Sequence, residues 1–170
     1  PDVKARHLGD ALRAIAARHP DFDLEFLGLL GVAEALAWLE RLPGVGRKVS
    51  ASTLNFSTLD MPALVVDTHV LRVLSRYGFV RSNADIRTAY DAAMAASPRW
   101  SAAKLAELHI LMKRLGQTTC RHDRAHCANC PIRLRCKAAA APARRLVRVG
   151  GRDMHLRREP ARERRGAWQE

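Results

Sequence analysis

The pattern of apolar and polar residues along the chain predicts a series of amphipathic helices. Apolar residues recur every three or four positions, and strand-like alternation is nearly absent. Leu8, Leu12 and Ile15 fall on one face of a first helix, which ends just before Pro20 because proline cannot continue it. The apolar stretch 26–30 that follows fits either a helix or a strand.

A pair of helices joined by a glycine turn comes next. The first runs from about Val32 to Leu42 and stops at Pro43. After Gly44 and Gly46 the helical pattern resumes over 48–57. The pattern therefore predicts a helix, a tight turn and a second helix.

The rest of the pattern is also helical. Asp67 stands at the N-cap position of a helix whose apolar positions repeat through Tyr77. Two further helices are predicted over 83–96 and 101–118. The second turns four large apolar side chains inward, namely Leu105, Leu108, Met112 and Leu115. The only strand-like run, 63–66, is too short to build a sheet, so we predict an all-α fold.

The net charge of the sequence indicates which kind of molecule the protein binds. The 170 residues hold 29 Lys and Arg against 17 Asp and Glu, a net charge of +12 with a pI near 10.7. Such a surface suits a polyanion, and nucleic acid is the simplest one. No apolar run is long enough to cross a bilayer and no signal peptide opens the sequence. We therefore expect a soluble, intracellular, cytoplasmic protein with no membrane partner.

The two ends of the sequence differ from its middle. It starts at Pro1 rather than Met and enters a helical pattern at once, so we expect the natural N-terminus to be missing. From Arg144 to Glu170 there are nine Arg against four acidic residues. This composition predicts a flexible basic tail over about 138–170.

All four cysteines lie within one short segment. Their spacing is six, two and five residues, and four thiolates so placed can converge on one metal centre, either tetrahedral zinc or a [4Fe–4S] cluster. The wide outer spacings favour the bulkier cluster over a single zinc ion. The segment also carries four arginines that suit phosphate. The cysteines are Cys120, Cys127, Cys130 and Cys136, and the arginines are Arg121, Arg124, Arg133 and Arg135.

The remaining candidate binding and catalytic residues lie in the glycine turn and at the starts of the helices that follow Gly46 and Asp67. The segment Leu42-Pro43-Gly44-Val45-Gly46-Arg47-Lys48 can bring backbone N–H groups at a helix start close to a phosphate, although an ordinary interhelical turn would have the same sequence. Lys48 lies in the first turn of that helix, where the dipole and the neighbouring Arg47 disfavour its ammonium form, as a nucleophile requires, although a solvated surface lysine would fit the same sequence. Asp67 is either a simple helix cap or a fixed carboxylate that stabilises positive charge.

Taken together and in this order, the glycine hairpin, the segment Val66-Asp67-Thr68-His69 and the 6-2-5 cysteine loop resemble the endonuclease III branch of the helix-hairpin-helix DNA glycosylases. The resemblance extends from about Lys4 to Cys136. The cysteine spacing is its most specific part. The family has further helices before the point where this sequence begins, and nothing here matches them.

The resemblance implies a domain plan and a set of roles. Residues 1–118 would form the glycosylase core with a helix-hairpin-helix at about 32–57, residues 119–137 the iron–sulfur loop and residues 138–170 the tail. Lys48 would be the Schiff-base nucleophile, Asp67 the catalytic carboxylate and the four cysteines the ligands of a [4Fe–4S] cluster. The DNA contacts would be Leu42, Pro43, Gly44, Val45, Gly46 and Arg47, together with Arg121 and Arg124.

The implied activity is base-excision repair by a monomer. A damaged base, expected to be an oxidised pyrimidine, would be released from duplex DNA, and an associated AP lyase step would nick the strand. Two alternatives stay open. A monofunctional glycosylase for uracil or mismatched bases would use Asp67 and water, and a non-catalytic DNA-binding module would need neither Lys48 nor Asp67.

Overall fold

The computed structural model describes residues 2–140. The chain divides into two units, Pro1–Ala140 and Ala141–Glu170. The basic tail predicted over 138–170 starts inside a helix, since residues 138–140 belong to α7 (Lys137–Ala140), and the rest of the predicted tail lies outside the described residues.

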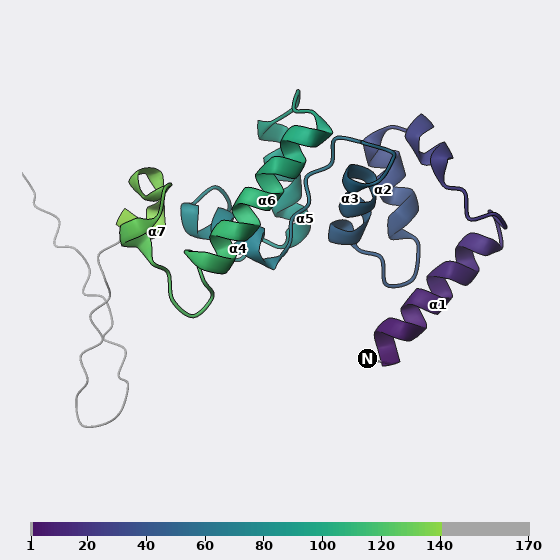
Figure 1. Cartoon of the computed structure of the whole chain (residues 1–170), viewed down its shortest axis with the longest axis horizontal. Helices are drawn as coiled ribbons and strands as arrows, with labels where there is room; N and C mark the ends of the chain where they lie inside the picture. Colours follow the sequence, from purple (N-terminus) through teal and green to yellow (C-terminus); the bar gives the residue numbers. More distant parts are fainter. Residues whose placement is uncertain (1, 141–170) are drawn as a thin grey trace, which may run out of the picture. The chain divides into compact units, whose positions relative to one another are not determined.

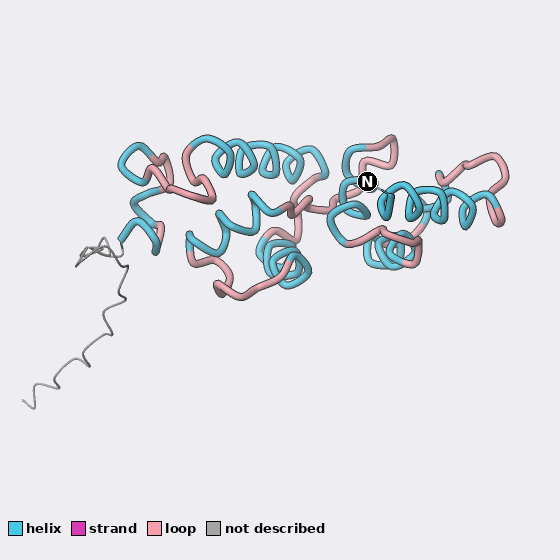
Figure 2. The backbone as a smooth tube through the Cα atoms, turned by 90° about the horizontal axis from the view of Figure 1, so that it is seen from below, coloured by secondary structure: helices cyan, strands magenta, loops and turns pink. Residues whose placement is uncertain are grey.

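Helices make up the described part, and no strand occurs between residues 2 and 140 (Figure 2). The all-α prediction is confirmed, and the run 63–66 forms an extended connector rather than a strand. None of these helices has the length and apolarity that a bilayer crossing requires. The α-helices are α1 (Asp2–Ala16), α2 (Val32–Glu40), α3 (Arg47–Phe56), α4 (Thr68–Tyr77), α5 (Ile86–Ala96), α6 (Ala102–Thr118) and α7 (Lys137–Ala140); the 3-10 helices are η1 (Glu25–Leu29), η2 (Cys127–Asn129) and η3 (Arg133–Arg135).

The predicted helix-hairpin-helix is present as α2, a turn over 41–46, and α3, and the two helices pack against each other (Figure 1). Within the turn the N–H of Val45 donates to the carbonyl of Leu42 at 3.1 Å. Gly44 has a φ of 73°, in the left-handed region that favours glycine. The sequence therefore specifies this turn through its glycine.

The connector from α3 to α4 forms the centre of the core. Ala63, Leu64, Val65 and Val66 are at most 2% exposed. They belong to one apolar cluster with residues of α2, α3, α4, α5 and α6. Because this connector ends at Asp67, the core fixes where α4 begins.

Helices α4 and α6 lie side by side in both views (Figures 1 and 2). Gly116 permits the contact, because a Cβ there would come within 2.9 Å of the His69 Cβ and 3.2 Å of the His69 carbonyl oxygen. Further along α6, Leu108, Met112 and Leu115 are only half buried, since they line an apolar cavity between α4, α5 and α6.

Some helix limits differ from the expected ones. The helix predicted over 83–96 begins at Ile86, because the Asp85 carboxylate accepts a hydrogen bond from the Thr88 N–H and so caps the helix there. The first helix ends at Ala16, and the chain continues as a turn before Pro20. On its apolar face, Leu8 and Leu12 are 63% and 45% exposed.

Candidate active site and metal loop

The start of α3 offers unpaired backbone donors. Gly46 is the N-cap and has no side chain to satisfy the first N–H groups of the helix. The N–H groups of Val49 and Ser50 bond to the Gly46 carbonyl, whereas those of Arg47 and Lys48 have no acceptor among residues 2–140. With the positive end of the helix dipole, these donors form a site suited to a phosphate.

Lys48 is exposed in the first turn of α3 and lies on the wall of an open cavity between α3 and α6. Val65 also lines this cavity, whereas Asp67, two residues further along the chain, is not among the lining residues. His109 also lines it, with Nδ1 2.7 Å from the Val65 carbonyl oxygen, so that Nδ1 carries the proton it donates. A substrate bound in the cavity would lie against the Lys48 side chain.

Asp67 forms the N-cap of α4, as predicted. Its Oδ1 accepts hydrogen bonds from the N–H groups of His69 at 2.8 Å and Val70 at 2.9 Å. Within the described part, no hydrogen bond reaches Oδ2. The carboxylate is therefore held rigidly by one oxygen while the other remains available. Lys48 and Asp67 stand at the starts of two helices joined through the buried connector, and no hydrogen bond or ion pair between their side chains occurs in residues 2–140.

Arg47 has a structural partner that the sequence did not indicate. Its Nε lies 2.6 Å from Oε1 of Glu40, at an angle unsuited to a hydrogen bond, and its guanidinium carbon lies 4.7 Å from the centre of the Tyr90 ring. The other oxygen of Glu40 pairs with Arg87 at 2.6 Å and raises the pKa of that guanidinium. Burial raises the pKa of the Tyr90 phenol. The predicted DNA contact of Arg47 therefore rests on its backbone N–H, since its side chain turns inward.

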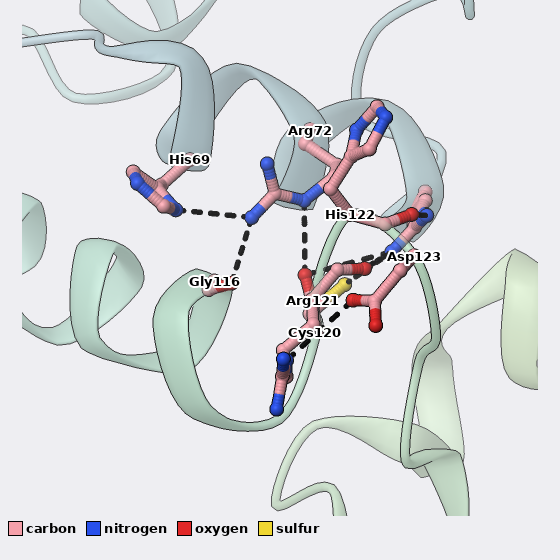
Figure 3. A network of polar contacts seen from close by, with 8 residues as sticks. His69, Arg72, Gly116, Cys120, Arg121, His122 and Asp123 are labelled. Carbon is pink, nitrogen blue, oxygen red and sulfur yellow. Dashed lines mark hydrogen bonds and ion pairs between the residues drawn. The ribbon is translucent and has the colours of Figure 1, made fainter.

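Two arginines of α4 hold the start of the cysteine loop, and Figure 3 shows the contacts of Arg72. Arg72 donates from Nε to the Cys120 carbonyl at 2.9 Å, and from Nη2 to the Gly116 carbonyl at 2.7 Å and to Nδ1 of His69 at 3.0 Å. Arg76 donates from Nη2 to the His122 carbonyl at 3.0 Å, and its Nη1 lies 3.6 Å from the Cys120 sulfur. The helix that Asp67 caps therefore also anchors the loop.

The four cysteines face one small cavity. Cys120, Cys127, Cys130 and Cys136 all line it, between apolar side chains of α4 and α6. The thiol of Cys136 also donates to the carbonyl of Arg76 at 3.4 Å. No three ligating side chains within residues 2–140 lie close enough together to share a single metal ion. The four cysteines thus share the lining of one small cavity.

The arginines predicted to contact DNA lie at the exposed surface of the same loop. The Nε of Arg121 is 3.5 Å from the Asp123 carboxylate, and both side chains remain more than half exposed. The backbone N–H of Asp123 is the main cause of a lowered pKa of that carboxyl, with Arg121 adding to it. Arg124 is exposed as well. Both arginines are accessible to a phosphate.

Comparison with known proteins gives several relatives that are named endonuclease III. The chain is 33% identical over 104 residues to endonuclease III of Rickettsia felis, which covers 61% of this chain and 46% of that protein. It is also 33% identical over 101 residues to endonuclease III of Bacillus subtilis, covering 58% and 43%. No family model matches. The chain thus spans less than half the length of these relatives.

A solved structure extends the likeness to three dimensions. A trapped covalent intermediate of endonuclease III with DNA superposes with a TM-score of 0.63 at 25% identity, over 81% of this chain and 59% of that one. The chain has an endonuclease III-like fold.

Within this endonuclease III-like fold, the structure adds residues that sequence reasoning did not single out. Arg72 and Arg76 are four residues apart on α4 and so share a face, which the sequence spacing could have indicated. The cavity beside Lys48 also receives Lys113 and Gln117 from α6. No motif marked these two residues, because only the packing of α3 and α6 brings them near Lys48.

Proposed function

We propose that this protein is a base-excision repair DNA glycosylase with an associated AP lyase activity, acting on duplex DNA that carries an oxidised pyrimidine or an abasic site. The observation that carries the proposal is the pair Lys48 and Asp67, each at the start of a helix on either side of one buried connector. The endonuclease III relatives support the same activity class.

Binding would begin at the hairpin. The free N–H groups of Arg47 and Lys48 would hold a backbone phosphate, and the exposed Arg121 and Arg124 would hold others. The target nucleotide must leave the base stack, because its glycosidic carbon cannot be reached inside the duplex. Lys48 lines two cavities, and the one that it shares with Phe56 and α6 is the candidate receiver for it.

The chemistry would then use the two side chains in turn. The neutral Lys48 amine attacks the anomeric carbon as the bond to the base breaks, and the base leaves with the bonding electrons. The free oxygen of Asp67 offsets the positive charge that develops on the sugar. Loss of a proton from the nitrogen and opening of the sugar ring, in which the bond from the anomeric carbon to the ring oxygen breaks and that oxygen takes up a proton, give a Schiff base between the sugar and Lys48. Removal of a hydrogen from the adjacent sugar carbon then expels the 3′ phosphate and nicks the strand.

Two product assays on one duplex test this sequence of steps. With a site-specific oxidised pyrimidine we expect both free base and a nicked strand. Free base without nicking would point to a monofunctional glycosylase, and binding without either product would point to a non-catalytic module. Both results would contradict the proposal.

We further propose that Cys120, Cys127, Cys130 and Cys136 hold a [4Fe–4S] cluster. The support is a set of four cysteines that line one cavity, together with their wide 6-2-5 spacing in the sequence. When bound, the cluster would supply four iron–sulfur bonds that cross-link the loop. Protein purified anaerobically should contain about four irons per chain and absorb broadly near ~400 nm. A colourless protein with one zinc per chain would contradict the assignment.

A further inference from the structure

The cavity beside Lys48 has a second wall, formed by one face of α6. Ile110, Lys113, Arg114 and Gln117 all line the cavity, and their spacing of three, four and seven residues places them in one stripe of the helix. We call these four residues the α6 wall. It faces Lys48, Ser52 and Phe56 of α3 across a cavity of about 470 Å³, a size typical of ligand sites.

The chemistry of the α6 wall suits a nucleotide. Lys113 and Arg114 are exposed and, within residues 2–140, neither side chain forms an ion pair with an acidic residue. Together with Lys48 they bring three cations to one cavity, which favours an anionic occupant. The Phe56 ring, 49% exposed, adds an apolar surface on which a base could stack. The Gln117 amide can both donate to and accept from a base edge.

We propose that the α6 wall binds the extruded nucleotide, with Lys113 contacting a phosphate that flanks the lesion and Gln117 contacting the base. This inference rests on the proposed function, since it names the substrate contacts of the same site. It assigns discrimination between bases to a residue of α6, a helix that carries neither Lys48 nor Asp67.

Two DNA duplexes separate the two roles. One carries a non-cleavable abasic analogue, which keeps the phosphates but lacks the base, and the other carries an intact oxidised pyrimidine. In the full chain, Lys113→Met should weaken binding to both duplexes by about five- to tenfold and lower the slope of log affinity against log salt by about 1. Gln117→Ala should leave binding of the abasic duplex unchanged and slow base release from the intact lesion by about tenfold.

A matched control comes from the same helix. Lys104 is exposed on α6, lies 5.2 Å from the Trp100 ring and is not part of the cavity wall. Lys104→Met removes the same charge and should change affinity less than twofold at equal salt. Lys113→Arg, which keeps the charge, should restore the affinity lost in Lys113→Met, and this rescue excludes a mere folding defect.

The outcomes are distinct. If Lys113→Met binds the abasic duplex as tightly and with the same salt slope as Lys104→Met, the phosphate role is wrong. If Gln117→Ala weakens abasic binding or leaves base release unchanged, the base role is wrong. The affinities for the abasic duplex are measured without covalent chemistry. An inactive wild-type enzyme would therefore contradict the proposed function. The comparison of affinities would still decide whether Lys113 contacts a phosphate.

Discussion

At the scale of single residues, Asp67 combines two roles that can be separated by substitution. Its Oδ1 caps α4 through the N–H groups of His69 and Val70, while Oδ2 is free of hydrogen bonds within the described residues. Asparagine keeps an oxygen for the cap but removes the charge. Asp67→Asn should therefore fold normally and lose about 100-fold or more in base release, measured in single-turnover assays.

Asp67→Ala provides the matched comparison, since it removes the cap and the charge together. It should lose about 1 kcal/mol of unfolding free energy in urea titrations, which Asp67→Asn should retain. Equal base release by wild type and Asp67→Asn would show that the residue is only a cap.

Gly116 is a second residue whose role the structure makes testable. A methyl group there would collide with the His69 backbone oxygen as well as its Cβ, so neither helix can yield easily. Gly116→Ala should lower the free energy of unfolding by about 1–3 kcal/mol, although alanine is the better helix former.

Gly9 supplies the control for this substitution. It also lies inside a helix, but a Cβ there would meet only the flexible end of Arg13, at 3.5 Å. Gly9→Ala should be neutral or stabilise the protein by up to about 1 kcal/mol. Equal effects of the two substitutions in urea titrations would contradict the close packing of α4 on α6.

At the scale of elements, α4 connects the candidate catalytic carboxylate to the cysteine loop, residues 119–137. Arg76 donates to the backbone of residues 121 and 122 and lies near the sulfur of Cys120. Arg76→Gln should loosen this end of the loop. We expect amide exchange at His126, whose N–H bonds to the Thr119 carbonyl, to accelerate about tenfold or more.

The rate of iron loss gives a second, independent test of whether α4 holds the cysteine loop. Iron should be lost to a chelator faster from Arg76→Gln than from wild type. Arg81→Gln removes an equally charged, exposed arginine from the loop after α4 and should behave as wild type in both assays. Unchanged exchange and iron loss in Arg76→Gln would show that the loop does not depend on α4.

The helices and turns also show which features could be predicted from sequence patterns. Periodicity, Pro43 and the glycines predicted α2, the turn and α3, and the N-cap preference predicted the start of α4 at Asp67. The sequence did not predict that Arg47 would pair with Glu40, because that contact depends on how α3 packs against α2. Nor did it predict the α6 wall, since residues 48 and 113 meet only through tertiary packing.

At the scale of the whole molecule, charge and fold agree on one class of partner. The chain carries a net charge of +12, and the candidate phosphate donors of the hairpin add to it without side chains. The endonuclease III-like fold was expected from three short motifs because each fixes a local structure: a turn, a helix cap and a sulfur-lined loop. The 6-2-5 cysteine spacing was the most specific, and its wide outer loops were the reason for expecting a cluster rather than zinc.

The most direct test of the central claim is borohydride trapping on DNA with an abasic site, followed by mass mapping of the adduct. We predict one covalent adduct, located on the peptide that contains Lys48, and its complete loss in Lys48→Gln with duplex binding retained. Lys104→Gln, which removes an exposed lysine of α6, should be trapped as efficiently as wild type. An adduct on another residue, or undiminished trapping in Lys48→Gln, would contradict the assignment of Lys48 as the nucleophile.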